Sequence, residues 1–160
     1  MQKISTKDLL SLENYSQERE KIRKNLIEIK KDRKIQIGGN VTLLFENNAT
    51  IKYQIQEMLR VEKIFEEDGI KEELAAYNPL IPDGNNLKAT MLIEFPDAEE
   101  RKEKLSYLIG IEDKVWLQIG ENERIFGIAD EDLERSDEEK TSAVHFLRFE
   151  LSNLMIKDLK

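Results

Sequence analysis

One carboxylate lies on the apolar side of a predicted helix, where a charged group is unexpected. The helix spans residues 48–68, and at about 100° per residue its apolar side chains gather on one side. They are Ile51, Ile55, Met58 and Phe65. Glu62 points into the middle of this arc. Because burying a bare charge is costly, Glu62 must be ion-paired, protonated or hydrated, which makes it the first candidate for a site.

Arg148 is the predicted partner of this carboxylate. It lies in a predicted strand, residues 143–151, that is apolar on both faces and is therefore expected to be covered on both sides. A buried guanidinium needs a carboxylate, so we predict an ion pair between Glu62 and Arg148. Glu94 and Glu150 are the alternative carboxylates for the same arginine.

His145, the only histidine of the chain, is the one candidate for a general base of a serine triad. No Gly-x-Ser-x-Gly motif accompanies it, and a single histidine excludes a metal site with several histidines. The neighbours of His145 on the same strand face are apolar, namely Ala143, Leu147 and Phe149. We therefore expect a hydrogen-bonded histidine of an inner strand.

A metal site is the alternative use of these side chains. The candidate ligands are Glu57, Glu62 and His145, and carboxylates with one imidazole suit manganese, iron or magnesium better than zinc. Glu57 and Glu62 lie about 140° apart on their helix, so a further element would have to complete the site. The Gly38-Gly39 pair lacks the other glycines of a phosphate-binding loop. The sequence identifies no cofactor, and we expect none.

Composition excludes several classes of function. The 160 residues include no cysteine, which excludes disulfides, thiolate catalysis and cysteine-ligated iron–sulfur clusters. Residues 1–34 carry ten basic and six acidic groups, a net charge of +4. The other 126 residues carry fifteen basic and twenty-seven acidic groups, a net charge of −12. So acidic a body is a poor platform for nucleic acid, because phosphate binding depends on clustered lysine and arginine. Without a membrane-spanning run or a signal peptide, we expect a cytoplasmic protein.

Hydrophobic periodicity predicts helices and short strands in one α+β domain, residues 1–160. The predicted helices are 15–33, starting at an Asn14 cap, 49–67, 69–77, 97–108 and a short one after Ser152. The predicted strands are 35–37, 41–46, 88–95, 115–119, 124–128 and 143–151. Short hairpins between strands favour a mainly antiparallel sheet of about five or six strands packed with helices. Residues 130–140, with seven acidic side chains in eleven, are predicted to be a solvated loop.

Several segments together resemble an uncharacterised bacterial domain family of unknown function. They are residues 44–46, 50–62, 73–74, 77–80, 89–90 and 142–149, and the resemblance extends from Ile4 to about Leu151. Members of this family are often encoded near rubrerythrin-like and iron–sulfur oxidoreductase proteins. The resemblance therefore implies a role near redox or oxidative-stress chemistry, and it assigns no activity to any residue.

Two functions follow from these observations. The first is an accessory or binding protein that serves a redox partner, with a homo-oligomer as an open alternative. The second is an enzyme whose cleft collects Glu57, Glu62, Arg148 and His145, with a carboxylate as acid or base and the arginine holding a small anionic substrate, with or without a metal. We favour the first, because the chain lacks an identifiable nucleophile and cofactor motif.

Overall fold

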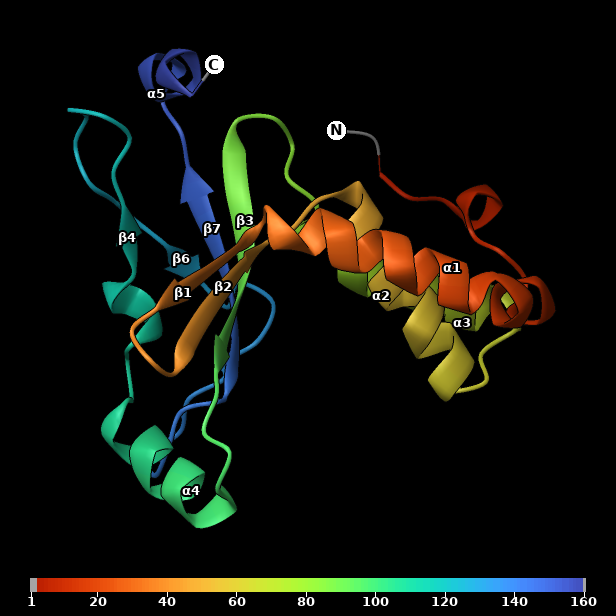
Figure 1. Ribbon diagram of the computed structural model, residues 1–160, viewed down its shortest axis with the longest axis horizontal. Helices are drawn as coiled ribbons and strands as arrows, with labels where there is room; N and C mark the ends of the chain where they lie inside the picture. The colour runs from red at the N-terminus through yellow and green to blue at the C-terminus, as the bar shows by residue number, and fades with distance from the viewer. Residues whose placement is uncertain (1–2, 160) are drawn as a thin grey trace. The chain divides into compact units, whose positions relative to one another are not determined.

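A computed structural model describes residues 3–159 of the chain (Figure 1). The chain forms two compact units. One, which we call the helical unit, contains the residues up to Arg33 together with Glu46–Asp83. The other, the sheet unit, contains Lys34–Phe45 and the residues from Gly84 onward. Helices and an antiparallel sheet thus occupy largely separate segments, which confirms the predicted α+β class.

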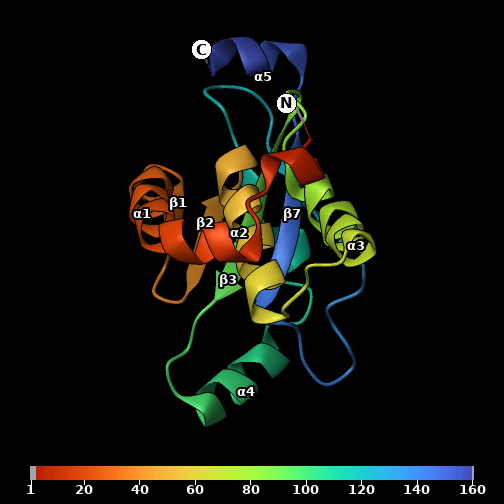
Figure 2. The ribbon, with the colours of Figure 1, turned by 90° about the vertical axis from the view of Figure 1, so that its right-hand side faces the viewer.

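The helical unit is built around its second helix. Its elements are η1 (Thr6–Asp8), α1 (Leu12–Lys31), α2 (Asn48–Val61), α3 (Glu67–Tyr77) and η2 (Asn78–Leu80). Helix α2 packs against both α1 and α3 (Figure 2). Its buried apolar side chains form a hydrophobic core with those of other segments of the unit. The buried residues of this core are Ile4, Ile51, Ile55, Leu59, Leu74 and Ile81. Helix α1 begins earlier than predicted, because Ser11 rather than Asn14 caps it. The Ser11 hydroxyl accepts a hydrogen bond from the backbone N–H of Asn14 at 3.2 Å.

The prediction that Glu62 lies on a buried helix face is wrong. Helix α2 ends at Val61, and Glu62 is its exposed C-cap residue. Lys63 then adopts the left-handed conformation with φ 54°, and the amide of Ile64 donates to the Leu59 carbonyl at 2.9 Å. This is a Schellman ending, in which Ile64 turns back onto Leu59 in the core. The helical phase extrapolated through residue 68 therefore does not apply to Glu62.

Glycine at position 63 is expected to stabilise this helix end. A left-handed residue with a β-carbon costs about 1–2 kcal/mol, and the greater chain entropy of glycine offsets part of the gain. We expect Lys63→Gly to raise the free energy of unfolding by about 0.5–1 kcal/mol in urea denaturation. Lys63→Ala is the matched control, since it removes the same charge and keeps the β-carbon. Equal stability of the two variants would contradict the assignment.

The sheet unit contains a five-stranded antiparallel sheet in the order β1-β2-β3-β7-β6 (Figure 1). Its strands are β1 (Lys34–Ile37), β2 (Val41–Phe45), β3 (Asn86–Ile93), β6 (Ile128–Ala129) and β7 (Val144–Glu150). The predicted hairpin through Gly38 is confirmed, with Ile37 opposite Val41. A separate pair, β4 (Trp116–Leu117) and β5 (Ile125–Phe126), forms where a hairpin was predicted. Two helices complete the unit: α4 (Ala98–Tyr107), capped by Asp97 as predicted, and α5 (Asn153–Asp158), capped by Ser152.

Strand β7 has one buried face and one partly open face. His145, Leu147 and Phe149 are buried, as the period of two requires, and Leu147 and Phe149 join the core of the unit. Val144 is exposed and Arg148 is half-buried on the opposite face. The strand is inside the sheet, between β3 and β6, but the prediction that both of its faces are covered is wrong.

Within residues 3–159, no helix combines the length and the apolar character needed to cross a lipid bilayer.

A buried polar network as the candidate functional site

His145 is the centre of a buried polar network in the sheet unit. Its side chain has no exposed surface. Its Nδ1 atom lies 2.6 Å from Oδ2 of Asp130, and its Nε2 atom lies 2.9 Å from the Thr141 hydroxyl and 3.0 Å from the Ser142 carbonyl oxygen. The predicted hydrogen-bonded histidine on an inner strand is therefore confirmed.

The position of strand β6 beside β7 places Asp130 next to His145. Ala129 pairs with Leu147 of β7, and Asp130, the next residue, has a left-handed backbone with φ 47°. Aspartate tolerates this conformation better than most residues with a side chain. The Oδ1 atom of Asp130 accepts the amide of Phe146 at 2.9 Å, which fixes the carboxylate on β7. Residues 130–140 were predicted to be a solvated loop, and this is wrong for Asp130. The pairing of β6 with β7 directs its carboxylate toward the buried His145.

The network continues from His145 to a second carboxylate. The hydroxyls of Thr141 and Ser136 are 2.7 Å apart, and Ser136 donates to Oε1 of Glu112 at 2.7 Å. Thr141 and Ser136 also form an isolated β-bridge, so the loop backbone holds the two hydroxyls together. Glu112 lies in the short helix η3 (Glu112–Lys114) and is only 8% exposed. Its Oε2 atom is buried and has no hydrogen-bond partner among the described residues.

Three members of the network could hold a cation. One potential ligand atom from each of Glu112, Asp130 and His145 lies within 4.8 Å of the others. Of the predicted metal ligands, only His145 belongs to this group. Sequence reasoning missed Glu112 and Asp130, because each lies in a short polar stretch that has no ligand spacing. The pairing of β6 with β7 was the missing information.

The order of carboxylate, imidazole and hydroxyl in this network is that of a nucleophilic triad. The hydroxyl, however, belongs to Thr141, which is only 2% exposed and is itself hydrogen-bonded to Ser136. A nucleophile must be able to reach a substrate atom, and this hydroxyl is closed off from solvent. The arrangement is better suited to holding a charge than to attacking a substrate.

Arg148 lies on the opposite face of β7 from His145, so these two residues do not line one cleft as the enzyme hypothesis required. Its guanidinium makes two hydrogen bonds of 2.8 Å to the carboxylate of Glu131 and a further one to Glu150. The alternative partner Glu150 is thus confirmed, and the predicted pair with Glu62 is wrong. The hydrogen bond with Glu131 is the main cause that raises the pKa of Arg148.

Glu57 belongs to a second polar cluster, in the helical unit. Arg19 donates to both of its carboxylate oxygens, at 2.7 and 2.8 Å, and the buried Tyr15 hydroxyl donates at 2.7 Å. Arg60 lies 3.6 Å away. The hydrogen bonds from Arg19 are the main cause that lowers the pKa of Glu57 to about 2, and Tyr15 and Arg60 act in the same direction. Burial and the same carboxylate raise the pKa of Tyr15.

The β4–β5 hairpin presents an aromatic surface to solvent. Trp116 and Phe126 are directly opposite each other, so they share one face, and they are 43% and 57% exposed. Arg124 lies over the Trp116 ring, with its guanidinium carbon 4.0 Å from the ring centroid. On the other face, Leu117 and Ile125 pack against the core of the sheet unit. We call the outward group of Trp116, Arg124 and Phe126 the aromatic face.

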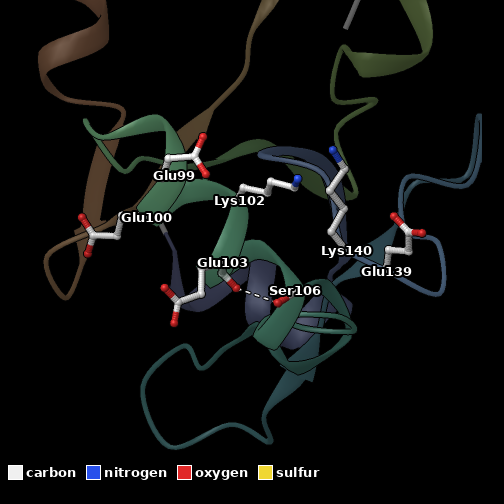
Figure 3. A pocket seen from close by; sticks show the side chains of 7 residues that line it. All are labelled: Glu99, Glu100, Lys102, Glu103, Ser106, Glu139 and Lys140. Atoms are coloured by element: carbon white, nitrogen blue, oxygen red, sulfur yellow. Dashed lines mark hydrogen bonds between the residues drawn. The ribbon is translucent and has the colours of Figure 1, made fainter.

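The sheet unit also has a pocket beside α4 (Figure 3). Lys102 projects from α4 and Lys140 from the segment before β7. The remaining lining residues are Glu99, Glu100, Glu103, Ser106 and Glu139. All seven are exposed, and they include four carboxylates and two ammonium groups. Because none of these seven lining residues is buried, the pocket does not indicate a particular ligand.

Comparisons with known proteins agree with the fold and provide no activity. The family described as "Protein of unknown function (DUF3501)" matches residues 3–160. A crystal structure of a novel protein of unknown function from Burkholderia pseudomallei K96243 is similar, with 51% sequence identity and a TM-score of 0.95. The match covers 99% of this chain and 82% of that one. No curated protein matches.

Proposed function

We propose that this chain, which belongs to the DUF3501 family of proteins of unknown function, is a cytoplasmic accessory protein that binds a redox protein partner. The observation that carries the proposal is the aromatic face. Tryptophan, arginine and aromatic side chains dominate the binding energy of protein interfaces. Here Trp116, Arg124 and Phe126 gather on a short hairpin whose other face is anchored in the core.

Charge indicates what kind of surface binds the aromatic face. The turn that joins β4 to β5 carries Glu121 and Glu123, and residues 35–160 have a balance of −12. A second copy of this chain would bring like charges together, which opposes association. The expected occupant is therefore a different protein, with an apolar pocket for the aromatic rings and a basic rim that attracts the acidic body.

The class of partner comes from the family resemblance. The resemblance implies that genes for rubrerythrin-like and iron–sulfur oxidoreductase proteins often lie near genes of this family, and this expectation favours a role in a redox or oxidative-stress system. Because the chain has no cysteine, such a role depends on a partner or on a cofactor held without sulfur ligands. The engagement of Glu57, Arg148 and His145 in ion pairs and hydrogen bonds also favours binding over catalysis.

Direct titration tests this proposal. The chain is mixed with a purified rubrerythrin-like protein, and separately with a purified iron–sulfur oxidoreductase, the two classes of partner that the resemblance implies, and binding is measured by calorimetry. We expect one of the two to bind, with an affinity that falls as salt rises. Phe126→Ala is expected to weaken binding by about 30-fold or more, the effect of losing an interface hot spot.

Phe65→Ala is the matched control, because Phe65 is 70% exposed and lies in the helical unit. It should leave the affinity unchanged. Absence of binding to both candidates, or equal affinities of the two variants, would contradict the proposal. Light scattering adds a further outcome: a dimer that Trp116→Ala converts to a monomer would identify the aromatic face as a self-interface.

A further inference from the structure

The hydrogen-bond network between Glu112 and Asp130 requires one positive charge more than its groups ordinarily carry. Four hydrogen bonds join Glu112, Ser136, Thr141, His145 and Asp130 in series. Each bond needs one proton. With ionised carboxylates, the two hydroxyls and a neutral imidazole supply only three. A proton or a metal ion must supply the remaining charge.

The directions of these bonds show where that charge belongs. Ser136 donates its only proton to Glu112, so Thr141 must donate to Ser136 and can only accept from His145. The Nε2 atom of His145 therefore carries a proton, in agreement with its 3.0 Å contact to the Ser142 carbonyl. The Nδ1 atom faces the Asp130 carboxylate, and a neutral imidazole leaves this nitrogen bare. The extra charge belongs between Nδ1 and Asp130.

A second observation at the same place indicates a ligand. Within residues 3–159, the Oε2 atom of Glu112 is buried without a hydrogen-bond partner, although buried polar atoms in proteins are nearly always paired. Nearby, Arg135 binds Asp132 at 2.8 Å and lies 3.8 Å from Asp130. With a neutral His145, the carboxylates of Glu112, Asp130 and Asp132 and one guanidinium leave a net charge of −2. A divalent cation cancels that charge.

We propose that Glu112, Asp130 and His145 bind one divalent cation of the manganese or iron class. The ligand atoms are Nδ1 of His145 and one oxygen of each carboxylate. Atoms bound about 2.1 Å from one ion lie no more than about 4.2 Å apart, so a small inward movement of a cluster within 4.8 Å is enough. Binding releases any proton on Nδ1 to solvent. The Nε2–H group continues to donate to the Thr141 hydroxyl and the Ser142 carbonyl oxygen, as is typical of a histidine ligand.

The ligand set selects the ion. One imidazole and two carboxylates suit Mn²⁺ and Fe²⁺, whereas tight zinc sites favour more nitrogen or sulfur ligands. Three protein ligands also leave coordination positions for water. This inference does not depend on the proposed partner, since the residues of the aromatic face contribute no ligand.

Manganese binding to the tag-free, chelator-treated protein tests the proposal. Excess Mg²⁺ is included to occupy weak acidic surface sites. Free aqueous Mn²⁺ gives a six-line electron paramagnetic resonance signal, and we expect one equivalent per chain to be removed from it. Because His145 is the only histidine, bound Mn²⁺ should also selectively broaden the single set of imidazole signals in nuclear magnetic resonance spectra.

Two near-isosteric variants decide whether this cluster is the site. Glu112→Gln keeps an oxygen that accepts from Ser136, and Asp130→Asn keeps the left-handed backbone favourable. Each should weaken Mn²⁺ binding at least about 10–100-fold, a range that losses of outer-shell groups already cause. Glu99→Gln is the matched control, because Glu99 is an exposed carboxylate of α4 outside this cluster, and it should still bind one equivalent. Circular dichroism verifies that each variant is folded.

Two results would overturn the metal site. One is the absence of stoichiometric Mn²⁺ binding by the unmodified chain. The other is equal binding by the unmodified chain and Glu112→Gln, with or without broadening of the His145 signals. If Asp130→Asn fails to fold, Glu112→Gln alone decides. The assay contains no partner protein, so its result is independent of the titration that tests the aromatic face.

Discussion

Replacing His145 with alanine is expected to lower the free energy of unfolding of the metal-free protein by about 3–5 kcal/mol. His145 is fully buried, and its removal leaves the Asp130 carboxylate without its closest partner, 2.6 Å away. It also leaves the Thr141 hydroxyl without the ring nitrogen and opens a cavity on the buried face of β7. Urea denaturation followed by circular dichroism, with chelator present, measures the change.

A double-mutant cycle separates the charge effect from the cavity. Asp130→Asn removes the carboxylate charge while keeping a side chain that tolerates φ 47°. If the unpaired charge of Asp130 causes most of the loss, combining Asp130→Asn with His145→Ala should lower the free energy of unfolding by less than the sum of the two single losses. The expected difference is about 1–3 kcal/mol. Simple additivity, or a cost of His145→Ala below about 1 kcal/mol, would show that the network contributes little.

Glu57→Gln is expected to lower the free energy of unfolding at pH 7 by about 1.5–3 kcal/mol, the usual contribution of hydrogen bonds to a charged group. The carboxylate receives two bonds from Arg19 and one from the buried Tyr15 hydroxyl. Glutamine cannot accept all three in the same way, and it leaves Arg19 and Arg60 without their shared negative charge.

The pH dependence of this difference gives a sharper test. Folding lowers the pKa of Glu57 from 4.5 to about 2, so the unfolded chain takes up a proton first as the pH falls. The stability contributed by the carboxylate is therefore complete above about pH 4.5 and is lost as the pH approaches 2. Urea denaturation across this range should show the chain and Glu57→Gln converging in stability.

Other carboxylates also titrate on acidification, so only the difference between the two proteins is informative. Tyr15→Phe is a useful companion, because it removes one hydrogen bond and keeps the packing of the ring. It should cost less than Glu57→Gln, about 0.5–1.5 kcal/mol. A constant difference between the chain and Glu57→Gln from pH 7 to pH 2.5 would show that Arg19 does not hold the Glu57 charge in the folded state.

The two polar clusters have different physical characters. Around Glu57, the cations outnumber the carboxylates, because two guanidiniums surround one carboxylate at the edge of solvent. Around His145, the carboxylates outnumber the cations, and one carboxylate oxygen of Glu112 has no hydrogen-bond partner in the part of the chain that the structure describes. The first cluster is explained as a stabilising ion pair between α1 and α2. The second cluster has the excess of negative charge that a cation site requires. We therefore assign the metal to this cluster and not to Glu57.

The sequence by itself predicted the elements that depend on local signals. The hairpin through Gly38, the α4 cap at Asp97 and the α5 cap at Ser152 are confirmed, because turns and caps involve residues only a few positions apart. The apolar neighbours of His145 on its strand face, Ala143, Leu147 and Phe149, also correctly indicated that His145 lies in the interior. The α+β class follows from these elements and their order.

Only the tertiary structure decided which polar groups meet. Glu62 was misplaced because the helical phase was continued past a left-handed residue, Lys63, which no periodicity reveals. His145 contacts Asp130, 15 positions away, and is linked through Thr141 and Ser136 to Glu112, 33 positions away. Their approach depends on the register of β6 on β7 and on the loop that follows. A polar contact is fixed by distance in space, whereas sequence patterns report the periodicity of a single element.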